Sequence, residues 1–176
     1  MAFELNYLNK FEIDTKGDTD PTNVDDANFS PLAAGITQTT PALNETSDQT
    51  AYYDGQGFDS TDITGKRLSI AFAGNRVRGD AAQDFIVSKF LALGDDVKTL
   101  FRWTMTDGSV VIGECSITAI VPSGGNANAK QTLSFTIQFN NKPQFTAGTD
   151  NGGSNGGNTS SNDTAGKAVV GENTAE

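Results

Sequence analysis

The sequence predicts a β-rich α+β fold, in which one flanking helix packs on an antiparallel sheet of the β-sandwich or barrel-like kind. Several segments alternate apolar and polar residues with a period of two, which is typical of strands that bury one face. One segment, residues 80–93, instead repeats its apolar residues at helical spacing. An Asp-Gly dipeptide between two strand-like segments indicates a hairpin. Because everything around the helix has the pattern of strand or loop, a sheet is expected to cover its apolar face.

The helix has local signals at both ends. Asp80 is a suitable N-cap, Gln83 is placed for a capping box, and Asp84 adds negative charge to the first turn. Gly94 is the expected left-handed C-cap. The residues expected to form its buried face, including two that widen it, are Ala82, Phe85, Ile86, Val87, Phe90, Leu91 and Leu93.

The clearest strand signals lie beyond residue 60, in Arg67–Ala73, Thr99–Met105, Ser109–Val121 and Thr132–Asn140. The second and third of these flank Asp107-Gly108 and are expected to form the hairpin, with Gly113 as the site for a bend. Cys115 is expected to pack as a small apolar residue. The last segment alternates large apolar residues with uncharged polar ones, which predicts one buried face and one polar face.

Two stretches give weaker signals. Residues 32–50 contain many β-prone residues but show no clean alternation. Residues 51–58 look like a glycine-rich loop, in which Tyr52, Tyr53 and Phe58 either anchor the loop in the domain or contact a partner. No helix follows the Gly-Gln-Gly sequence of this loop, so a phosphate-binding function is rejected.

Composition divides the chain into three parts. Residues 1–31 comprise an N-terminal arm and an acidic, turn-rich loop; residues 32–145 form the β domain; and residues 146–176, rich in Gly, Asn, Ser and Thr, are expected to be disordered. The arm alternates weakly over residues 1–13, as a strand or an extended segment would. The acidic loop lacks the glycine and the terminal glutamate of an EF-hand, so a solvated loop is favoured over a calcium site at Asp18, Asp20, Asp25 and Asp26.

Composition also argues against catalysis. The 176 residues include no histidine, which removes the commonest general base and the commonest metal ligand. The acid pairs Asp54/Asp59 and Asp95/Asp96 are better explained as solvated turn and cap residues than as a catalytic pair. We therefore expect neither an enzyme nor a bound cofactor or metal.

The net charge of −10 is carried by the flanks: residues 1–60 sum to −9, residues 61–142 to +2 and residues 143–176 to −3. A chain this acidic is not expected to hold nucleic acid by neutralising its phosphates. The single cysteine excludes an intrachain disulfide, which fits a reducing cytosol. Neither a signal peptide nor a membrane-spanning segment is expected from the sequence.

Residues 40–143 resemble the major tail proteins, or tail-tube proteins, of long-tailed, non-contractile bacteriophages. The similar elements are Tyr53-Asp54-Gly55, Thr64-Gly65-Lys66, Gly74-Asn75-Arg76, the Gly79-Asp80 start of an Ala-Gln-Asp-Phe helix, and the later stretch PSGGNANAKQTLSFTIQFNNKP. The resemblance implies a β-sandwich core with one flanking helix. It also implies rings of six copies, whose sheets join into a β-barrel around an acidic channel, and which stack through the N-terminal arm and long loops.

The implied partners are further copies of the chain and the tape-measure, tail-tip and tail-terminator proteins, with DNA present only in transit. The implied location is the virion tail, assembled in the host cytoplasm without membrane insertion. An alternative function is a monomeric β domain that binds a glycan or a cell-surface partner through the aromatic residues of the 51–58 loop.

Within the tail-tube hypothesis, three segments are expected to mediate assembly, the third being a pair of arginines for which solvent exposure is an equal alternative. These are Phe3, Leu5 and Tyr7 of the arm; Tyr52, Tyr53 and Phe58 of the loop; and Arg76 and Arg78 before the helix. One row of polar side chains either lines the channel or is an ordinary solvent face: Thr132, Ser134, Thr136 and Gln138.

Overall fold

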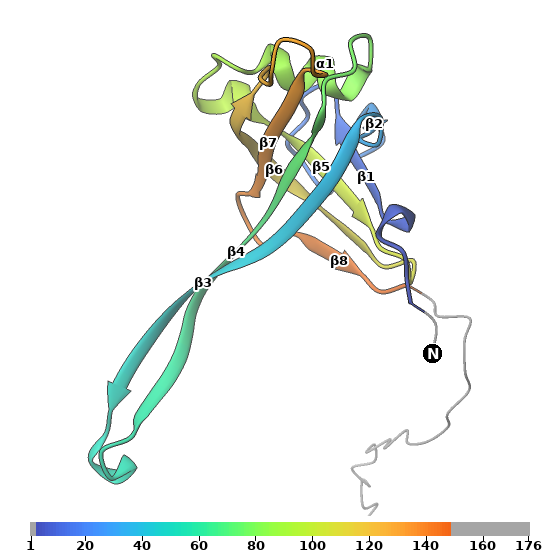
Figure 1. The fold of residues 1–176 in the computed structure, drawn as a ribbon. Helices are drawn as coiled ribbons and strands as arrows, with labels where there is room; N and C mark the ends of the chain where they lie inside the picture. The colour runs from blue at the N-terminus through green and yellow to red at the C-terminus, as the bar shows by residue number, and fades with distance from the viewer. Residues whose placement is uncertain (1–2, 149–176) are drawn as a thin grey trace, which may run out of the picture.

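Eight antiparallel strands and one α-helix form the fold of residues 3–148, the part of the chain that the structure, a computed structural model, describes (Figure 1). The β-rich α+β class predicted from the sequence is confirmed. The strands are β1 (Lys10–Asp14), β2 (Phe29–Pro31), β3 (Ile36–Ala51), β4 (Asp59–Asn75), β5 (Lys98–Thr104), β6 (Val110–Val121), β7 (Thr132–Phe139) and β8 (Gln144–Thr146). The helices are α1 (Ala81–Ser88) and three short 3-10 turns, η1 (Asn6–Leu8), η2 (Tyr53–Gly55) and η3 (Gly94–Val97).

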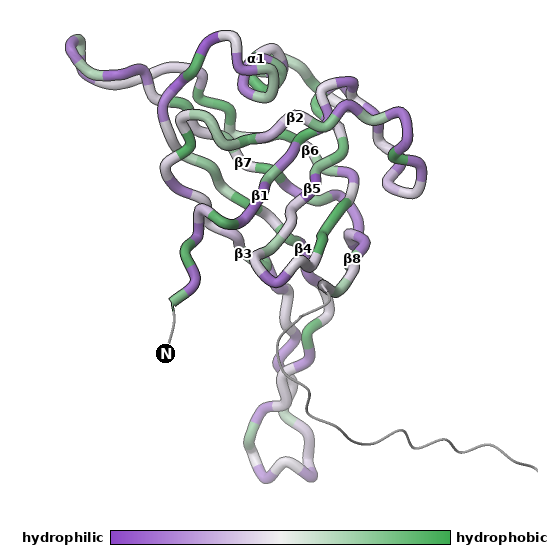
Figure 2. The backbone as a smooth tube through the Cα atoms, turned by 90° about the vertical axis from the view of Figure 1, so that its right-hand side faces the viewer, coloured by the Kyte–Doolittle hydropathy of each residue, from purple (hydrophilic) through white to green (hydrophobic). Residues whose placement is uncertain are grey.

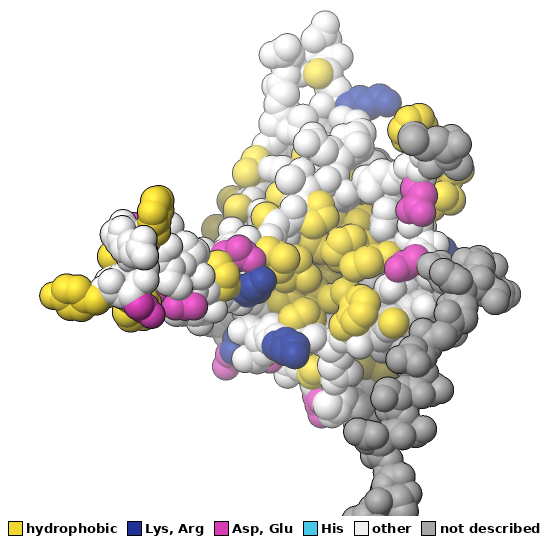
Figure 3. All heavy atoms as spheres, turned by 90° about the horizontal axis from the view of Figure 1, so that it is seen from below, with side chains coloured by type: hydrophobic (Ala, Val, Ile, Leu, Met, Phe, Trp, Pro, Cys, Tyr) yellow, Lys and Arg dark blue, Asp and Glu magenta, His cyan; other side chains and the backbone are white. Residues whose placement is uncertain are grey.

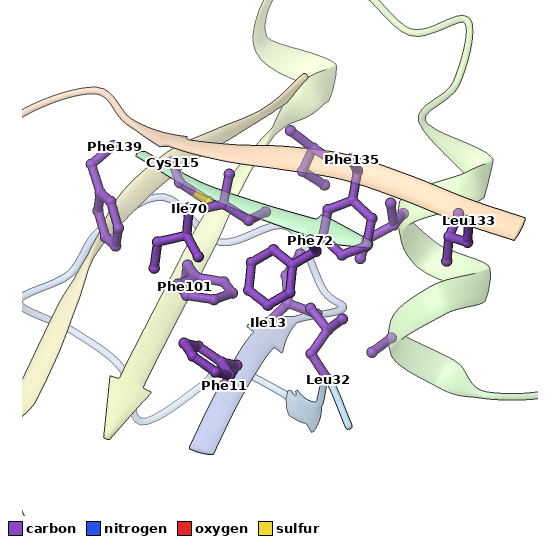
Figure 4. Packing of buried hydrophobic residues seen from close by; sticks show 14 of the residues in the cluster. Phe11, Ile13, Leu32, Ile70, Phe72, Phe101, Cys115, Leu133, Phe135 and Phe139 are labelled. Carbon is purple, nitrogen blue, oxygen red and sulfur yellow. The ribbon is translucent and has the colours of Figure 1, made fainter. Parts of the chain in front are cut away.

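The sheet curls over on itself. Its strand order is β2-β1-β5-β6-β7-β4-β3, and β8 pairs with residues 110–112 of β6, a part of that strand that β7 does not pair with. Three strands separate β1 from β4 in this order, yet the rings of Phe11 on β1 and Phe72 on β4 meet edge to face at 5.2 Å (Figure 4). The two halves of one sheet therefore enclose a common core, as in a sandwich or a partly open barrel.

The predicted alternation accounts for this core. On β7, Leu133, Phe135, Ile137 and Phe139 are buried while the residues between them are half-buried or exposed. Phe135 stacks on Phe72 with ring centroids 5.0 Å apart. Cys115 is fully buried, as expected, and this burial raises the pKa of its thiol.

The β5–β6 hairpin forms where the sequence predicts it, but its irregularity lies elsewhere. Gly108 has a φ of 82°, and the Asp107 carboxylate accepts hydrogen bonds from the Ser109 backbone N–H and hydroxyl, both at 2.8 Å. The break in the β6 ladder falls at Ala119, with a φ of 51°, and not at Gly113. At Gly113 a Cβ would lie 3.1 Å from the ring of Phe139, so this glycine permits close packing.

The helix is shorter than predicted. The Asp80 side chain caps it by accepting from the Gln83 N–H at 2.9 Å, but α1 ends at Ser88 and the expected span to residue 93 is wrong. Only Ala82, Gln83 and Ile86 are buried, where α1 packs on β1, β2 and β6. Residues 89–93 are exposed or half-buried, and tertiary packing rather than local propensity decides where a short helix ends. The expected C-cap Gly94, with a φ of 64°, instead begins η3.

The strands before the predicted boundary at residue 31 are continuous with the β domain. β1 and β2 belong to the main sheet, and Phe11 and Ile13 lie in its core. The buried carboxylate of Asp14 accepts backbone N–H groups of Gly17 and Asn28 at 2.8 and 2.7 Å, which holds the acidic loop against the body. The arm therefore ends before β1. Of the expected tail, Thr146 belongs to β8, and residues 149–176 lie outside the described residues.

The largest difference from the sequence prediction is the long β3–β4 hairpin. The weakly patterned residues 32–50 and the expected glycine-rich loop form β3 and the tip of this hairpin, in one ladder that runs from Ile36↔Gly74 to Ala51↔Asp59. Figure 1 shows it leaving the body on the side away from α1. Hydrophobic residues concentrate in the body, whereas most of the projecting ribbon is neutral or hydrophilic (Figure 2).

Candidate assembly interface

The distal half of the β3–β4 hairpin is a ribbon without a core. Residues 69–75 of β4 pair with β7 on one side and β3 on the other, but residues 59–68 pair with β3 alone. These ten positions project by about 33 Å at 3.3 Å per residue. A two-stranded ribbon is at best marginally stable in water on its own. A ribbon this long and this exposed is therefore expected to contact another molecule.

Three aromatic residues lie at the end of the ribbon. Tyr52, Tyr53 and Phe58 are 54%, 110% and 81% exposed. The turn between them is fixed by η2 and by left-handed conformations at Gln56 and Gly57, with φ of 52° and 88°. The alternative that these side chains anchor a loop inside the domain is wrong, because they lie at the end of the ribbon, away from the core.

The ribbon is also acidic. Between residues 46 and 65 the chain has four acids and no base: Asp48, Asp54, Asp59 and Asp62. The first basic residue, Lys66, pairs with Glu45 directly opposite it, at 2.8 Å, where the ribbon joins the body. The tip thus combines large apolar rings with uncompensated negative charge.

The N-terminal arm turns its polar side chains to the body and its apolar ones outward. Glu4 accepts a hydrogen bond from the Thr106 hydroxyl at 2.6 Å, Asn6 donates to the Thr39 hydroxyl at 3.2 Å, and Asn9 accepts from the Trp103 indole at 3.0 Å. The apolar side chains predicted to mediate assembly, Phe3, Leu5 and Tyr7, are 88%, 56% and 78% exposed. A hollow of about 260 Å³ separates the arm from the start of β3.

The two arginines before α1 differ in their surroundings. Arg76 is mostly covered and forms an ion pair with Asp84 of the same subunit, which lowers the pKa of that carboxyl. Its guanidinium also donates to the Val77 carbonyl. Arg78, in contrast, is exposed. Of the pair, Arg78 is the residue with a side chain available to a neighbour.

Gln83 connects the start of α1 to neighbouring segments through hydrogen bonds that the sequence did not predict. Rather than reaching back to Asp80 as in a capping box, its buried amide accepts from the Val77 N–H at 2.7 Å and donates to the Ala34 carbonyl at 2.6 Å. It thereby ties the start of α1 to the segment before β3.

Further exposed apolar surface was missed by the sequence analysis. The helical spacing predicts that Phe90, Leu91 and Leu93 are buried, but they are 49%, 83% and 84% exposed. Phe145 on β8 is 63% exposed. Seen from below, hydrophobic side chains also gather on the underside of the body, beside the hairpin at the left (Figure 3). Contiguous apolar patches on a soluble protein mark interaction sites.

The polar row of β7 points away from the core. Thr132 is exposed, and Ser134, Thr136 and Gln138 are half-buried, between core residues that point the other way. In the described part of the chain, no three His, Cys, Asp or Glu side chains are close enough to hold a metal ion. No helix among residues 3–148 has the length and apolar character needed to cross a bilayer.

Comparison with solved structures identifies the fold. A chain in the tail of an empty gene transfer agent particle, computed with helical refinement and C6 symmetry, is similar with a TM-score of 0.65 and 19% identity, over 82% of this chain and 100% of that chain. A chain from the virion of a native gene transfer agent particle has a TM-score of 0.62 and 19% identity over the same shares. A chain of the anti-feeding prophage cap, which terminates that tube, has a TM-score of 0.50 and 12% identity over 84% and 95%.

No protein-family model matches the sequence, and no curated protein matches it. The identification therefore depends on the arrangement of strands and helix, which these neighbours share over their whole length. This protein has the fold of phage tail-tube proteins.

Proposed function

We propose that this chain is the structural subunit of a tail tube, which assembles into stacked rings of six around a channel that passes DNA. The observation that carries the proposal is the β3–β4 hairpin: a bare ribbon with three exposed aromatic residues at its end. Neither packing in the subunit's own core nor a catalytic function explains this exposed ribbon. Burial of its aromatic residues against other copies does explain it. The C6 symmetry of the gene transfer agent tail supports a ring of six.

The positions of the apolar patches favour head-to-tail stacking. The aromatic tip lies on one side of the body and α1 on the other (Figure 1). Leu91 and Leu93, which follow α1, are among the most exposed apolar side chains of the body. A contact between two different patches is heterologous, and repetition of such a contact along an axis gives an open, growing tube. The arm, with Phe3, Leu5 and Tyr7, supplies a further contact between copies.

Further partners follow from this function: a tape-measure protein inside the channel, tail-tip and terminator proteins at its ends, and DNA in transit. Each subunit carries −10, so a ring of subunits does not hold DNA by its phosphates. The tube belongs to a virion tail of the long, non-contractile kind and is assembled in the host cytoplasm. Its function is mechanical and not enzymatic.

The assembly assay uses the purified full chain at rising concentration, with and without tail-tip and tape-measure proteins. Sedimentation velocity and negative-stain electron microscopy are expected to detect rings or tubes. A variant with Tyr52→Ser, Tyr53→Ser and Phe58→Ser is expected to keep the far-UV spectrum of the wild type and to lose assembly. A matched control, Thr61→Ser, changes an exposed ribbon residue without changing the aromatic tip. Unimpaired assembly of the triple variant would contradict the role of the hairpin.

A glycan-binding monomer is the second candidate, and the hairpin tip is the feature that favours it. Tyr52, Asp54, Phe58 and Asp59 border a hollow of about 380 Å³. Aromatic rings beside carboxylates suit stacking on, and hydrogen bonding to, a sugar. This candidate predicts a stable monomer that binds on a glycan array, whereas the tail-tube subunit polymerises and does not bind the array.

A further inference from the structure

Three adjacent rows on one face of the sheet carry no charged side chain across four strands. Opposed residues in an antiparallel ladder share a face, so the registers of β3, β4, β7 and β6 define rows on the side away from the core. Three such rows contain no acid and no base, and together they form what we call the uncharged face. They are Gln38–Ala73–Ser134–Val121, Thr40–Ala71–Thr136–Thr118, and Ala42–Ser69–Gln138–Ser116.

This neutrality is unusual for a surface in water. About a quarter to a third of surface residues are normally charged, so twelve positions are expected to include about three or four charges. Charges begin directly beyond the face: Arg67 lies in the next row of β4, and Lys98 of β5 is paired with Ser116. The lack of charge therefore belongs to this face and not to the region as a whole.

The face also lacks the side chains that make a stable protein contact. Interface cores are enriched in aromatic residues, Met and Arg, whereas here Val121 is the largest apolar residue. Several hydroxyls are already bonded within the sheet: Thr118 donates to the Thr136 carbonyl at 3.2 Å, and the Ser69 hydroxyl accepts from Asn44 at 2.9 Å. The result is a surface of short side chains, in contrast to the apolar arm and hairpin tip.

Building on the proposed function, we propose that the uncharged face lines the channel and gives its wall a band that neither attracts nor repels phosphates. The resemblance to tail-tube proteins implies an acidic channel; on this chain the acids would then surround the band. Lysine or arginine on the wall would hold DNA through counterion release, and long side chains would project into its path. A wall of Ser, Thr, Ala and Gln does neither, which suits the passage of double-stranded DNA.

Cysteine labelling of assembled tubes tests the position of this face. Thr136→Cys is introduced into the full chain, whose native Cys115 is buried, with a raised thiol pKa, and gives little background. Tubes are treated with N-ethylmaleimide, which diffuses along the channel, or with a maleimide coupled to serum albumin, which is too large to enter. We expect reaction with the small reagent alone. The unassembled variant is expected to react with both reagents, as are the same tubes after dissociation.

Two results overturn the inference while leaving the proposed function intact. Reaction of assembled tubes with both reagents would put the face on the outer surface, and reaction with neither would bury it between subunits. If Thr136→Cys does not assemble, Ser69→Cys on β4 provides the same test from the neighbouring strand. Failure of the wild-type chain to form tubes would instead reject the proposed function, and the inference with it.

Discussion

Two glycines lie at the inner end of the long hairpin, within the body, where β3 begins and β4 ends. A Cβ on Gly74 would lie 2.2 Å from the Gly35 carbonyl oxygen, and a Cβ on Gly35 would lie 2.4 Å from the Asn75 carbonyl oxygen. The chain needs this close approach because Asn75 donates to the Gly35 carbonyl at 2.8 Å, beside an irregularity in the ladder after Ile36. No side chain fits between two backbones at this distance.

Gly74→Ala is therefore expected to destabilise the subunit by about 1–3 kcal/mol, the usual cost of overpacking. The matched control is Gly65→Ala on the same strand, where the nearest atoms to an added Cβ are 3.6 Å away. We expect this control to change the free energy of unfolding by at most about 0.5 kcal/mol. Urea unfolding followed by circular dichroism measures both, and equal effects would contradict the explanation.

The Arg76–Asp84 pair makes stability depend on pH at the acid end. The hydrogen bond and the positive charge of Arg76 hold the pKa of the Asp84 carboxyl below its ordinary value. A lowered carboxyl pKa in the folded state contributes stability above the unfolded pKa, and this contribution is lost as pH falls through the folded pKa. Asp84→Asn is thus expected to lower the urea midpoint at pH 6 and to match the wild type near pH 2. An undiminished difference at pH 2 would show that the effect is not due to the charge.

At the scale of elements, the sequence predicted those strands that bury one face. β5, β6, β7 and the inner half of β4 alternate because the core selects apolar residues at every second position. The ribbon has no buried face within the subunit, so no alternation marks it. The error at α1 has a related cause: periodicity identified Phe90 and Leu93 as apolar positions, but it does not say whether the subunit itself or a neighbour covers them.

Removal of the ribbon tests whether it belongs to the fold or to assembly. Residues 46–65 are replaced by Asn-Gly, which keeps the opposed pair Glu45 and Lys66 and supplies a two-residue hairpin turn. Because the core contains none of residues 46–65, the shortened chain is expected to fold with a thermal midpoint close to that of the wild type. It is expected to form no tubes in sedimentation. Loss of the folded state would mean that the ribbon stabilises the body.

At the scale of the whole molecule, net charge disfavours association between copies of the chain, whereas exposed apolar surface favours it. Subunits of −10 repel one another, whereas the exposed rings of the tip and the arm favour association. Salt screens the repulsion and leaves apolar burial in place. Tube formation is therefore expected to become more favourable between about 20 mM and 300 mM NaCl, where the Debye length falls well below 10 Å. A decrease in assembly over this range would indicate that ion pairs, such as one made by Arg78, dominate the contact.

The sequence alone does not predict how copies of the chain are arranged in an assembly. The exposed residues of the arm, the tip and the Arg78 segment could be predicted as candidates, but the structure leaves them on separate parts of one subunit. Which of these patches contact each other depends on the geometry of the assembly. A local sequence pattern predicts that a residue is buried, but it does not say whether the same chain or another copy covers that residue.

Cryo-electron microscopy of the assembled full chain tests the central claim most directly. The account predicts a hollow tube of six-fold rings, in which the tip residues Tyr52, Tyr53 and Phe58 are buried against an adjacent copy. A chain that remains a compact monomer at high concentration, even with tail-tip and tape-measure proteins present, would contradict it. So would a tube in which the β3–β4 hairpin projects into solvent without touching a neighbour.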